Sequence, residues 1–124
     1  ADKILIVDDD PAICKLLEKV MHSNELETTT VNCGMDALSI LKNHTFDLIL
    51  MDIQMPIMNG YEAAAKIRRI DDRKKADIPI IALTANAFSE DKDNAIKAGM
   101  NDHVPKPIDM NVLLPAMQKL ITGK

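Results

Sequence analysis

The stretch Leu48-Ile49-Leu50-Met51-Asp52 decides the fold of this chain of 124 residues. Four consecutive apolar residues without helical periodicity predict a short strand that is buried on both faces. The aspartate comes at the carboxyl end of that strand, where open parallel sheets bind their ligands. The loop at residues 55–60 contains a proline and a glycine, and it is expected to end the strand and lead into a helix. Asp52 should therefore lie in a crevice at one edge of a sheet.

The rest of the chain alternates between strand and helix patterns. Apolar or β-branched runs predict four further strands, at residues 3–7, 27–31, 80–83 and 102–104. The second of these is rich in threonine and polar enough for an edge position. Amphipathic patterns and capping residues predict five helices, at about 11–23, 34–43, 61–70, 90–98 and after Asp109. The charged run 71–77 is expected to be a loop. Together these elements predict a single three-layer α/β domain over residues 1–124, with a parallel sheet covered by helices on both faces.

The composition argues against several classes of function. With 47% hydrophobic residues, the chain can bury a core without disulfides or a structural metal. The net charge is -4 and only 2% of the residues are aromatic, so direct binding to nucleic acid is not expected. Cys14 and Cys33 lack the spacing of metal ligands and are expected to be reduced thiols of a cytoplasmic protein. Since neither a signal peptide nor a membrane-spanning apolar run is found, no membrane contact is expected; the start at Ala1 fits a processed terminus or a domain excised from a longer chain.

Acidic residues gather at the predicted strand ends. Asp8, Asp9 and Asp10 follow the first strand, and Asp52 ends the third. Carboxylates packed together raise each other's pKa and cost stability, and a bound Mg²⁺ removes that cost. Asp9 and Asp52 are the expected metal ligands, with Asp8 orienting a bound water and Asp10 capping the helix. In the alternative, all three N-terminal acids only cap a helix, but this does not explain Asp52.

Two further residues suit phosphoryl chemistry. Thr84 closes the fourth strand, and Lys106 lies between two prolines just after the fifth. A metal, a hydroxyl and an ammonium group around a carboxylate are what an acyl phosphate needs. Asp52 is therefore expected to be the nucleophile, with Thr84 and Lys106 binding the phosphoryl oxygens.

The whole chain resembles a receiver domain of the two-component response-regulator family. The resemblance is carried by Ile6-Val7-Asp8-Asp9-Asp10-Pro11, Leu50-Met51-Asp52-Ile53-Gln54-Met55-Pro56-Ile57-Met58-Asn59-Gly60, Leu83-Thr84-Ala85 and Lys106-Pro107. It implies the flavodoxin-like strand order 2-1-3-4-5 and a cis peptide bond between Lys106 and Pro107. It also implies that a phosphohistidine donor phosphorylates Asp52, with Mg²⁺ or Mn²⁺ held by Asp8, Asp9, Asp52 and the backbone carbonyl of Gln54.

The family's switch is a second implication of the resemblance. Thr84 is expected to move toward the phosphoryl group while an aromatic residue of the fifth strand rotates inward. That position is His103 here, which either rotates as a planar ring, brings a pH-dependent charge, or does not switch. Gln54 and Asn86 are expected to flank the attacking water and so to set the lifetime of the phosphoryl group.

Details of the motifs around Asp52 and His103 resemble the receivers of hybrid sensor histidine kinases. The last predicted helix carries few acids and so lacks the charged pattern with which one large class of DNA-binding regulators dimerises, and a monomer is therefore expected. The resemblance implies a domain that catalyses only its own phosphorylation and dephosphorylation, either alone or as the cytoplasmic part of a membrane-anchored kinase. Its partner would be a histidine kinase or a histidine phosphotransfer domain. That partner is expected to dock on Ala12, Lys15, Pro107 and Ile108.

Three other functions compete with this interpretation. A Mg²⁺-dependent hydrolase with an aspartyl-phosphate intermediate usually has a second acid two residues after the nucleophile, where this chain has Gln54. A nucleotide- or flavin-binding module would need a glycine-rich loop after the first strand, but the chain has only four glycines and none there. The third alternative is an interaction domain that never takes phosphate; the complete acidic pocket, Thr84 and Lys106 argue against it.

Overall fold

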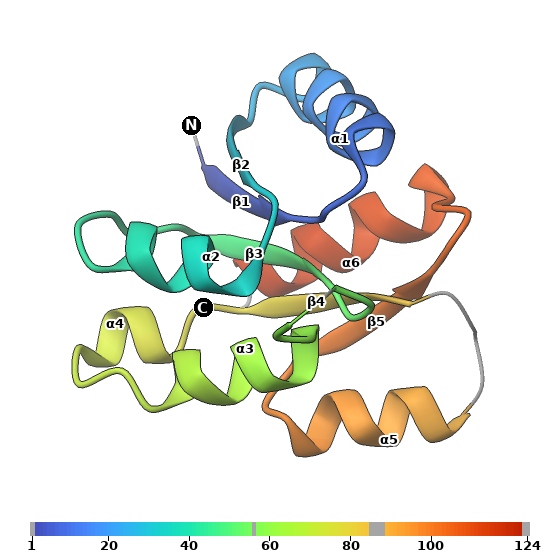
Figure 1. Cartoon of the computed structure of the whole chain (residues 1–124). Coiled ribbons are helices and arrows are strands. Elements are labelled where there is room, and N and C mark those ends of the chain that lie inside the picture. The colour runs from blue at the N-terminus through green and yellow to red at the C-terminus, as the bar shows by residue number, and fades with distance from the viewer. Residues whose placement is uncertain (1, 56, 85–88, 123–124) are drawn as a thin grey trace.

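The computed structural model describes residues 2–55, 57–84 and 89–122. Five parallel strands form a single sheet in the order β2-β1-β3-β4-β5 (Figure 1), which confirms the order implied by the family resemblance. The strands are β1 (Lys3–Val7), β2 (Glu27–Val31), β3 (Leu48–Asp52), β4 (Ile80–Thr84) and β5 (Asp102–Pro105). β2 lies at one edge, as its threonine-rich sequence predicted.

The described residues form six helices, one more than predicted. They are α1 (Pro11–Ser23), α2 (Gly34–Leu41), α3 (Gly60–Arg68), α4 (Arg73–Ala76), α5 (Ser89–Lys97) and α6 (Met110–Thr122). The additional helix, α4, lies in the charged run that was wrongly expected to be a loop. The Asp72 carboxylate caps this turn by accepting a hydrogen bond from the Lys74 amide, and Ala76 is buried. A helix of four residues is too short to show a periodic pattern in the sequence.

The helices cover both faces of the sheet, which gives the three predicted layers (Figure 1). On one face, α1 and α6 contribute Leu17 and Leu113 to a cluster built on alternate strand residues such as Ile4. On the other face, α2 and α3 contribute Ala37 and Ile67 to a second cluster. β3 and β4 are buried along their whole length, and for β3 the uninterrupted apolar run predicted this.

Arg68 ties several elements together at the end of the sheet where β4 begins. Its guanidinium group donates hydrogen bonds to the carbonyl oxygens of Gly99 (2.8 Å), Ala76 (2.6 Å) and Ile78 (2.7 Å) and to Oδ1 of Asn101 (2.9 Å). Burial of the guanidinium lowers the pKa of Arg68, an effect that the charge of Asp77 opposes. One side chain therefore joins α3, α4, the start of β4 and the connection from α5 to β5.

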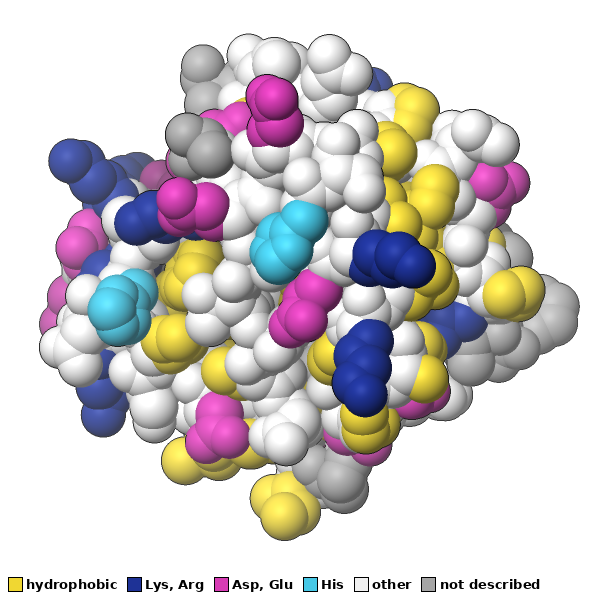
Figure 2. Space-filling model, turned by 90° about the horizontal axis from the view of Figure 1, so that it is seen from above, with side chains coloured by type: hydrophobic (Ala, Val, Ile, Leu, Met, Phe, Trp, Pro, Cys, Tyr) yellow, Lys and Arg dark blue, Asp and Glu magenta, His cyan; other side chains and the backbone are white. Residues whose placement is uncertain are grey.

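The surface shows no continuous charge of one sign on the side seen from above. Acidic, basic and histidine side chains are scattered among uncharged polar groups there (Figure 2). Among the described residues, no helix has the length and hydropathy needed to cross a bilayer.

Candidate functional site

The site lies where β1, β3 and β4 end. Of the described residues, the buried polar or charged ones are Asp8, Asp52 and Thr84, and each follows or ends one of these strands. The strands place them together because the carboxyl ends of neighbouring parallel strands meet at one edge of the sheet. Asp10, by contrast, caps α1 as predicted, since its carboxylate accepts a hydrogen bond of 2.9 Å from the Ala12 amide.

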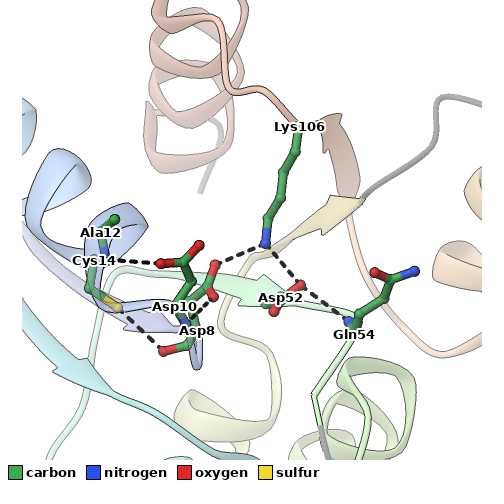
Figure 3. Close-up of polar contacts among 7 residues, drawn as sticks. All are labelled: Asp8, Asp10, Ala12, Cys14, Asp52, Gln54 and Lys106. Carbon is green, nitrogen blue, oxygen red and sulfur yellow. Dashed lines mark hydrogen bonds and ion pairs between the residues drawn. The ribbon is translucent and has the colours of Figure 1, made fainter.

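Lys106 reaches into this edge from the connection between β5 and α6 (Figure 3). Its Nζ lies 3.2 Å from Oδ2 of Asp8 and 3.2 Å from Oδ1 of Asp52, so one ammonium group pairs with both buried carboxylates. The Lys106 amide donates a hydrogen bond of 2.6 Å to the carbonyl oxygen of Thr84, and the bond between Lys106 and Pro107 is cis. The hydrogen bond holds the backbone of Lys106 against the end of β4.

Three carboxylates are close enough to hold one cation. Ligand oxygens of Asp8, Asp9 and Asp52 all lie within 4.8 Å of one another. Oδ2 of Asp8 is buried and accepts no hydrogen bond among the described residues, although it faces Nζ of Lys106. Asp9 is exposed, which leaves one side of the cluster open to solvent. This set of oxygen donors fits a hard divalent cation such as Mg²⁺.

The electrostatics of the site agree with that fit. Burial, and after it the charge of Asp8, raises the pKa of Asp52 to about 6. The charge of Lys106 opposes this rise, and so does the backbone amide of Gln54, which donates a hydrogen bond of 3.1 Å to Oδ1 of Asp52. Burial lowers the pKa of Lys106, but Asp8 and Asp52 together raise it above its ordinary value. Lys106 is therefore charged at neutral pH, while the ionised form of Asp52 is disfavoured and would be stabilised by a cation.

The remaining predicted residues are Thr84, His103 and Asn86. Thr84 ends β4 with 1% of its surface exposed. His103 lies on β5 opposite Ala82, and its buried Nδ1 accepts or donates no hydrogen bond among the described residues, with Oδ1 of Asp102 3.9 Å away. Asn86 lies outside the described residues.

The four predicted docking residues flank the same edge of the sheet. Ala12, Lys15 and Pro107 are exposed, whereas Ile108 is half-buried and packs against the cluster between the sheet and α6.

Two residues that shape the site, Gly60 and Cys14, were not among the predicted site residues. A Cβ atom on Gly60 would lie 2.5 Å from the carbonyl oxygen of Asp52, so only glycine lets α3 begin this close to the strand. Cys14 donates a hydrogen bond from Sγ to the carbonyl oxygen of Asp8 at 3.3 Å. Burial, and then the charge of Asp8, raises the pKa of this thiol to about 11, so it stays protonated. The glycine that closes the loop was a usable signal, whereas nothing in the sequence marks Cys14.

Comparison with known proteins identifies the family to which this fold belongs. The family model of the response regulator receiver domain matches residues 4–118. The chain belongs to this family. As a receiver domain of two-component signalling, it shares 36% identity over 120 residues with the sensor protein GacS of Pseudomonas syringae pv. syringae, a match that covers 96% of this chain and 13% of that protein.

Two solved structures are similar over nearly the whole receiver domain. The receiver domain of sensor histidine kinase PA1611 from Pseudomonas aeruginosa PAO1, solved with a magnesium ion in its active-site cleft, is 35% identical, with a TM-score of 0.88 and coverage of 98% of both chains. The receiver domain of Ssk1 in complex with the histidine phosphotransfer protein Ypd1, from Saccharomyces cerevisiae, is 28% identical. That match has a TM-score of 0.90 and covers 98% of this chain and 89% of the other.

Proposed function

We propose that this receiver domain takes a phosphoryl group from a phosphohistidine donor onto Asp52. The observation that carries the proposal is the contact of one ammonium group, Nζ of Lys106, with two buried carboxylates at 3.2 Å. An aspartate that serves only as a structural ion-pair partner would not need a second buried acid and a third, exposed one within metal-binding distance. The same groups suit the charge that develops on a phosphoryl group during its transfer.

In the proposed reaction, a carboxylate oxygen of Asp52 attacks the phosphorus atom of the phosphohistidine. The new O–P bond forms as the P–N bond breaks, and the electron pair of the P–N bond stays on the imidazole nitrogen. Lys106 neutralises one phosphoryl oxygen, and the Thr84 hydroxyl donates a hydrogen bond to another. Hydrolysis of the acyl phosphate returns Asp52, with Gln54 and Asn86 beside the attacking water.

The metal that supports this reaction would be Mg²⁺, with Mn²⁺ as a substitute. Asp8, Asp9, Asp52 and the backbone carbonyl of Gln54 would hold it. When bound, it supplies positive charge that stabilises the ionised Asp52 and the phosphoryl oxygens. The magnesium ion in the cleft of the PA1611 receiver domain supports this assignment.

Phosphorylation would act as a switch because it adds roughly -1.5 to -2 charges at a single point. We expect this charge to shift the population between two arrangements of Thr84, His103 and α5. His103 lies on the edge strand β5, which β4 separates from the strand of Asp52, and this position is consistent with a role in passing the change to the outer surface of β5.

The donor would be a histidine kinase or a histidine phosphotransfer domain. The complex of Ypd1 with the Ssk1 receiver domain supports this class of partner. We place its docking surface on Ala12, Lys15, Pro107 and Ile108, beside Asp52. Residues 1–124 would act as one monomeric receiver domain in the cytoplasm, alone or within a hybrid histidine kinase; two free cysteines suit that reducing compartment.

Intact mass after incubation with phosphoramidate and Mg²⁺ tests the proposal directly. The wild-type chain should gain one phosphoryl group, and the gain should disappear in EDTA and in Asp52→Asn. Asp71→Asn removes an exposed acid with the same change in charge and should be phosphorylated normally. An equal gain in Asp52→Asn would refute the assignment. If no protein gains mass and fluoroberyllate does not bind, an interaction domain independent of phosphate is the better interpretation.

A further inference from the structure

The edge strand β2 leaves backbone hydrogen-bonding groups without partners. The Glu27 amide donates to the carbonyl oxygen of Asp2, and the Asp8 amide donates to that of Val31, so these alternate residues of β2 face β1. Backbone groups alternate in direction along a strand. The N–H and C=O groups of Thr28 and Thr30 therefore point away from the sheet, and they make no backbone hydrogen bond with other described residues.

The opposite edge of the sheet is protected, whereas this one is not. β5 is shorter and ends in Pro105, which has no amide hydrogen, and the His103 amide is already bonded to Oδ1 of Asp102 at 2.7 Å. Short edges, prolines and local side-chain bonds are common ways of preventing strand addition. β2 contains neither proline nor lysine. The side chains of Thr28 and Thr30 bond to His22 and Glu18 of α1, which leaves the backbone edge itself open.

Hollows adjoin this edge on more than one side. A groove of about 710 Å³ runs from Asp8 and Asp9 past Thr30 to His44, with α1 and α2 as its walls. A second hollow of about 300 Å³ lies beside Thr28, Thr29 and Phe46. An added strand needs this combination, because its backbone pairs with the edge and its side chains alternate between the two faces.

The charge of the groove indicates what kind of strand would pair. The groove is lined by four acidic residues and one lysine, namely Asp8, Asp9, Glu18, Asp36 and Lys15. Even if a metal occupies Asp8 and Asp9, Glu18 and Asp36 leave an excess of negative charge. A second copy of this chain would bring the same acids to the contact and would be repelled.

We propose that the open edge of β2 binds an extended, basic segment of a partner protein, which adds a sixth strand to the sheet. The segment would form backbone hydrogen bonds with Thr28 and Thr30 and place lysine or arginine side chains near Glu18 and Asp36. This surface adjoins the proposed docking surface, because Lys15 of α1 belongs to both. Its use does not depend on the phosphorylation of Asp52.

The experiment uses a short peptide of alternating valine and lysine as the probe, added to the ¹⁵N-labelled chain in Mg²⁺ buffer. The peptide should shift the amide resonances of residues 27–32 and slow hydrogen exchange at Thr28 and Thr30 by about tenfold at about ten times its Kd. A peptide with glutamate in place of lysine should not bind. A peptide N-methylated at every second residue keeps its charge but cannot pair as a strand, and it should give no protection.

Variants separate backbone pairing from other effects. Thr30→Pro removes the outward amide hydrogen and should abolish protection at Thr28, whereas Thr30→Val loses only the hydroxyl and should bind normally. Asp52→Asn should also bind normally, so failure here and failure of the phosphorylation test are distinguishable. Equal binding of the N-methylated peptide, shifts without exchange protection, or self-association through β2 in place of peptide binding would each overturn the proposal.

Discussion

Asp52→Asn should make the metal-free receiver domain more stable at neutral and alkaline pH. The pKa of Asp52 in the folded chain is about 6, compared with an ordinary value of 3.8. Because the folded pKa is raised, the protonated Asp52 makes its full contribution to the free energy of unfolding below pH 3.8, and this contribution is lost as the pH rises through 6. The shift is about two pKa units at about 1.4 kcal/mol each, so the full loss is about 3 kcal/mol. Asparagine resembles the neutral acid in shape and avoids this loss.

Urea unfolding in EDTA between pH 5 and pH 8 measures the difference. The free energy of unfolding of the wild type should fall relative to that of Asp52→Asn by about 1.4 kcal/mol over this range, because the unfolded chain is already ionised at pH 5 and about one pH unit remains below the folded pKa of about 6. Asp71→Asn is the matched control, and because Asp71 is exposed its effect should stay within about 0.5 kcal/mol. Adding Mg²⁺ should stabilise the wild type more than Asp52→Asn, since a ligand that binds the folded state raises its stability.

The reasoning fails if Asp52→Asn is less stable than the wild type at pH 8 in EDTA. It also fails if the difference between the two proteins does not change with pH. Either result would mean that Lys106 compensates completely for the burial of the ionised Asp52, so that ionisation of Asp52 does not lower the free energy of unfolding.

Three other substitutions give predictions that unfolding measurements can check. Ile57 has φ of +69° and a fully exposed side chain, so Ile57→Gly should stabilise the chain by about 0.5–1 kcal/mol because it removes the strain of the left-handed backbone. Ile57→Val keeps that strain, and equal stability of the Gly and Val variants would contradict the prediction. Gly60→Ala should destabilise by about 1–3 kcal/mol, because its Cβ atom would meet the Asp52 carbonyl; normal stability with full phosphorylation would show that the backbone yields easily. Arg68→Met should destabilise by about 3 kcal/mol by leaving carbonyl groups without a donor, and a loss below 1 kcal/mol would show that water replaces the guanidinium group.

Periodicity was sufficient to predict all five strands and five of the helices. The uninterrupted apolar run at residues 48–51 predicted a strand buried on both faces, and the threonines of β2 predicted an edge strand. Such patterns report which side of an element is buried, but not which strand lies beside which. The order of the strands came from the resemblance to a family. The four-residue helix α4 was missed because one turn has no period.

The contents of the site were predictable only in part. Parallel strands bring their carboxyl ends to one edge, so the gathering of Asp8, Asp52 and Thr84 follows from the strand assignment itself. The simultaneous contact of Lys106 with both carboxylates does not, because it depends on how a loop after β5 folds back over β4. The same is true of Gly60, whose importance lies in the distance between two backbone segments.

The hydrogen bonds of Arg68 have a mechanical consequence. They hold the carbonyl oxygen of Gly99, just beyond the last turn of α5, against α3 and the start of β4. The far end of α5, by contrast, follows Thr84, at the edge of the sheet that holds Asp52. A displacement of α5 would therefore be a rotation about a fixed C-terminal pivot. Its amplitude would be greatest at the N-terminal end of α5 and smallest at Gly99.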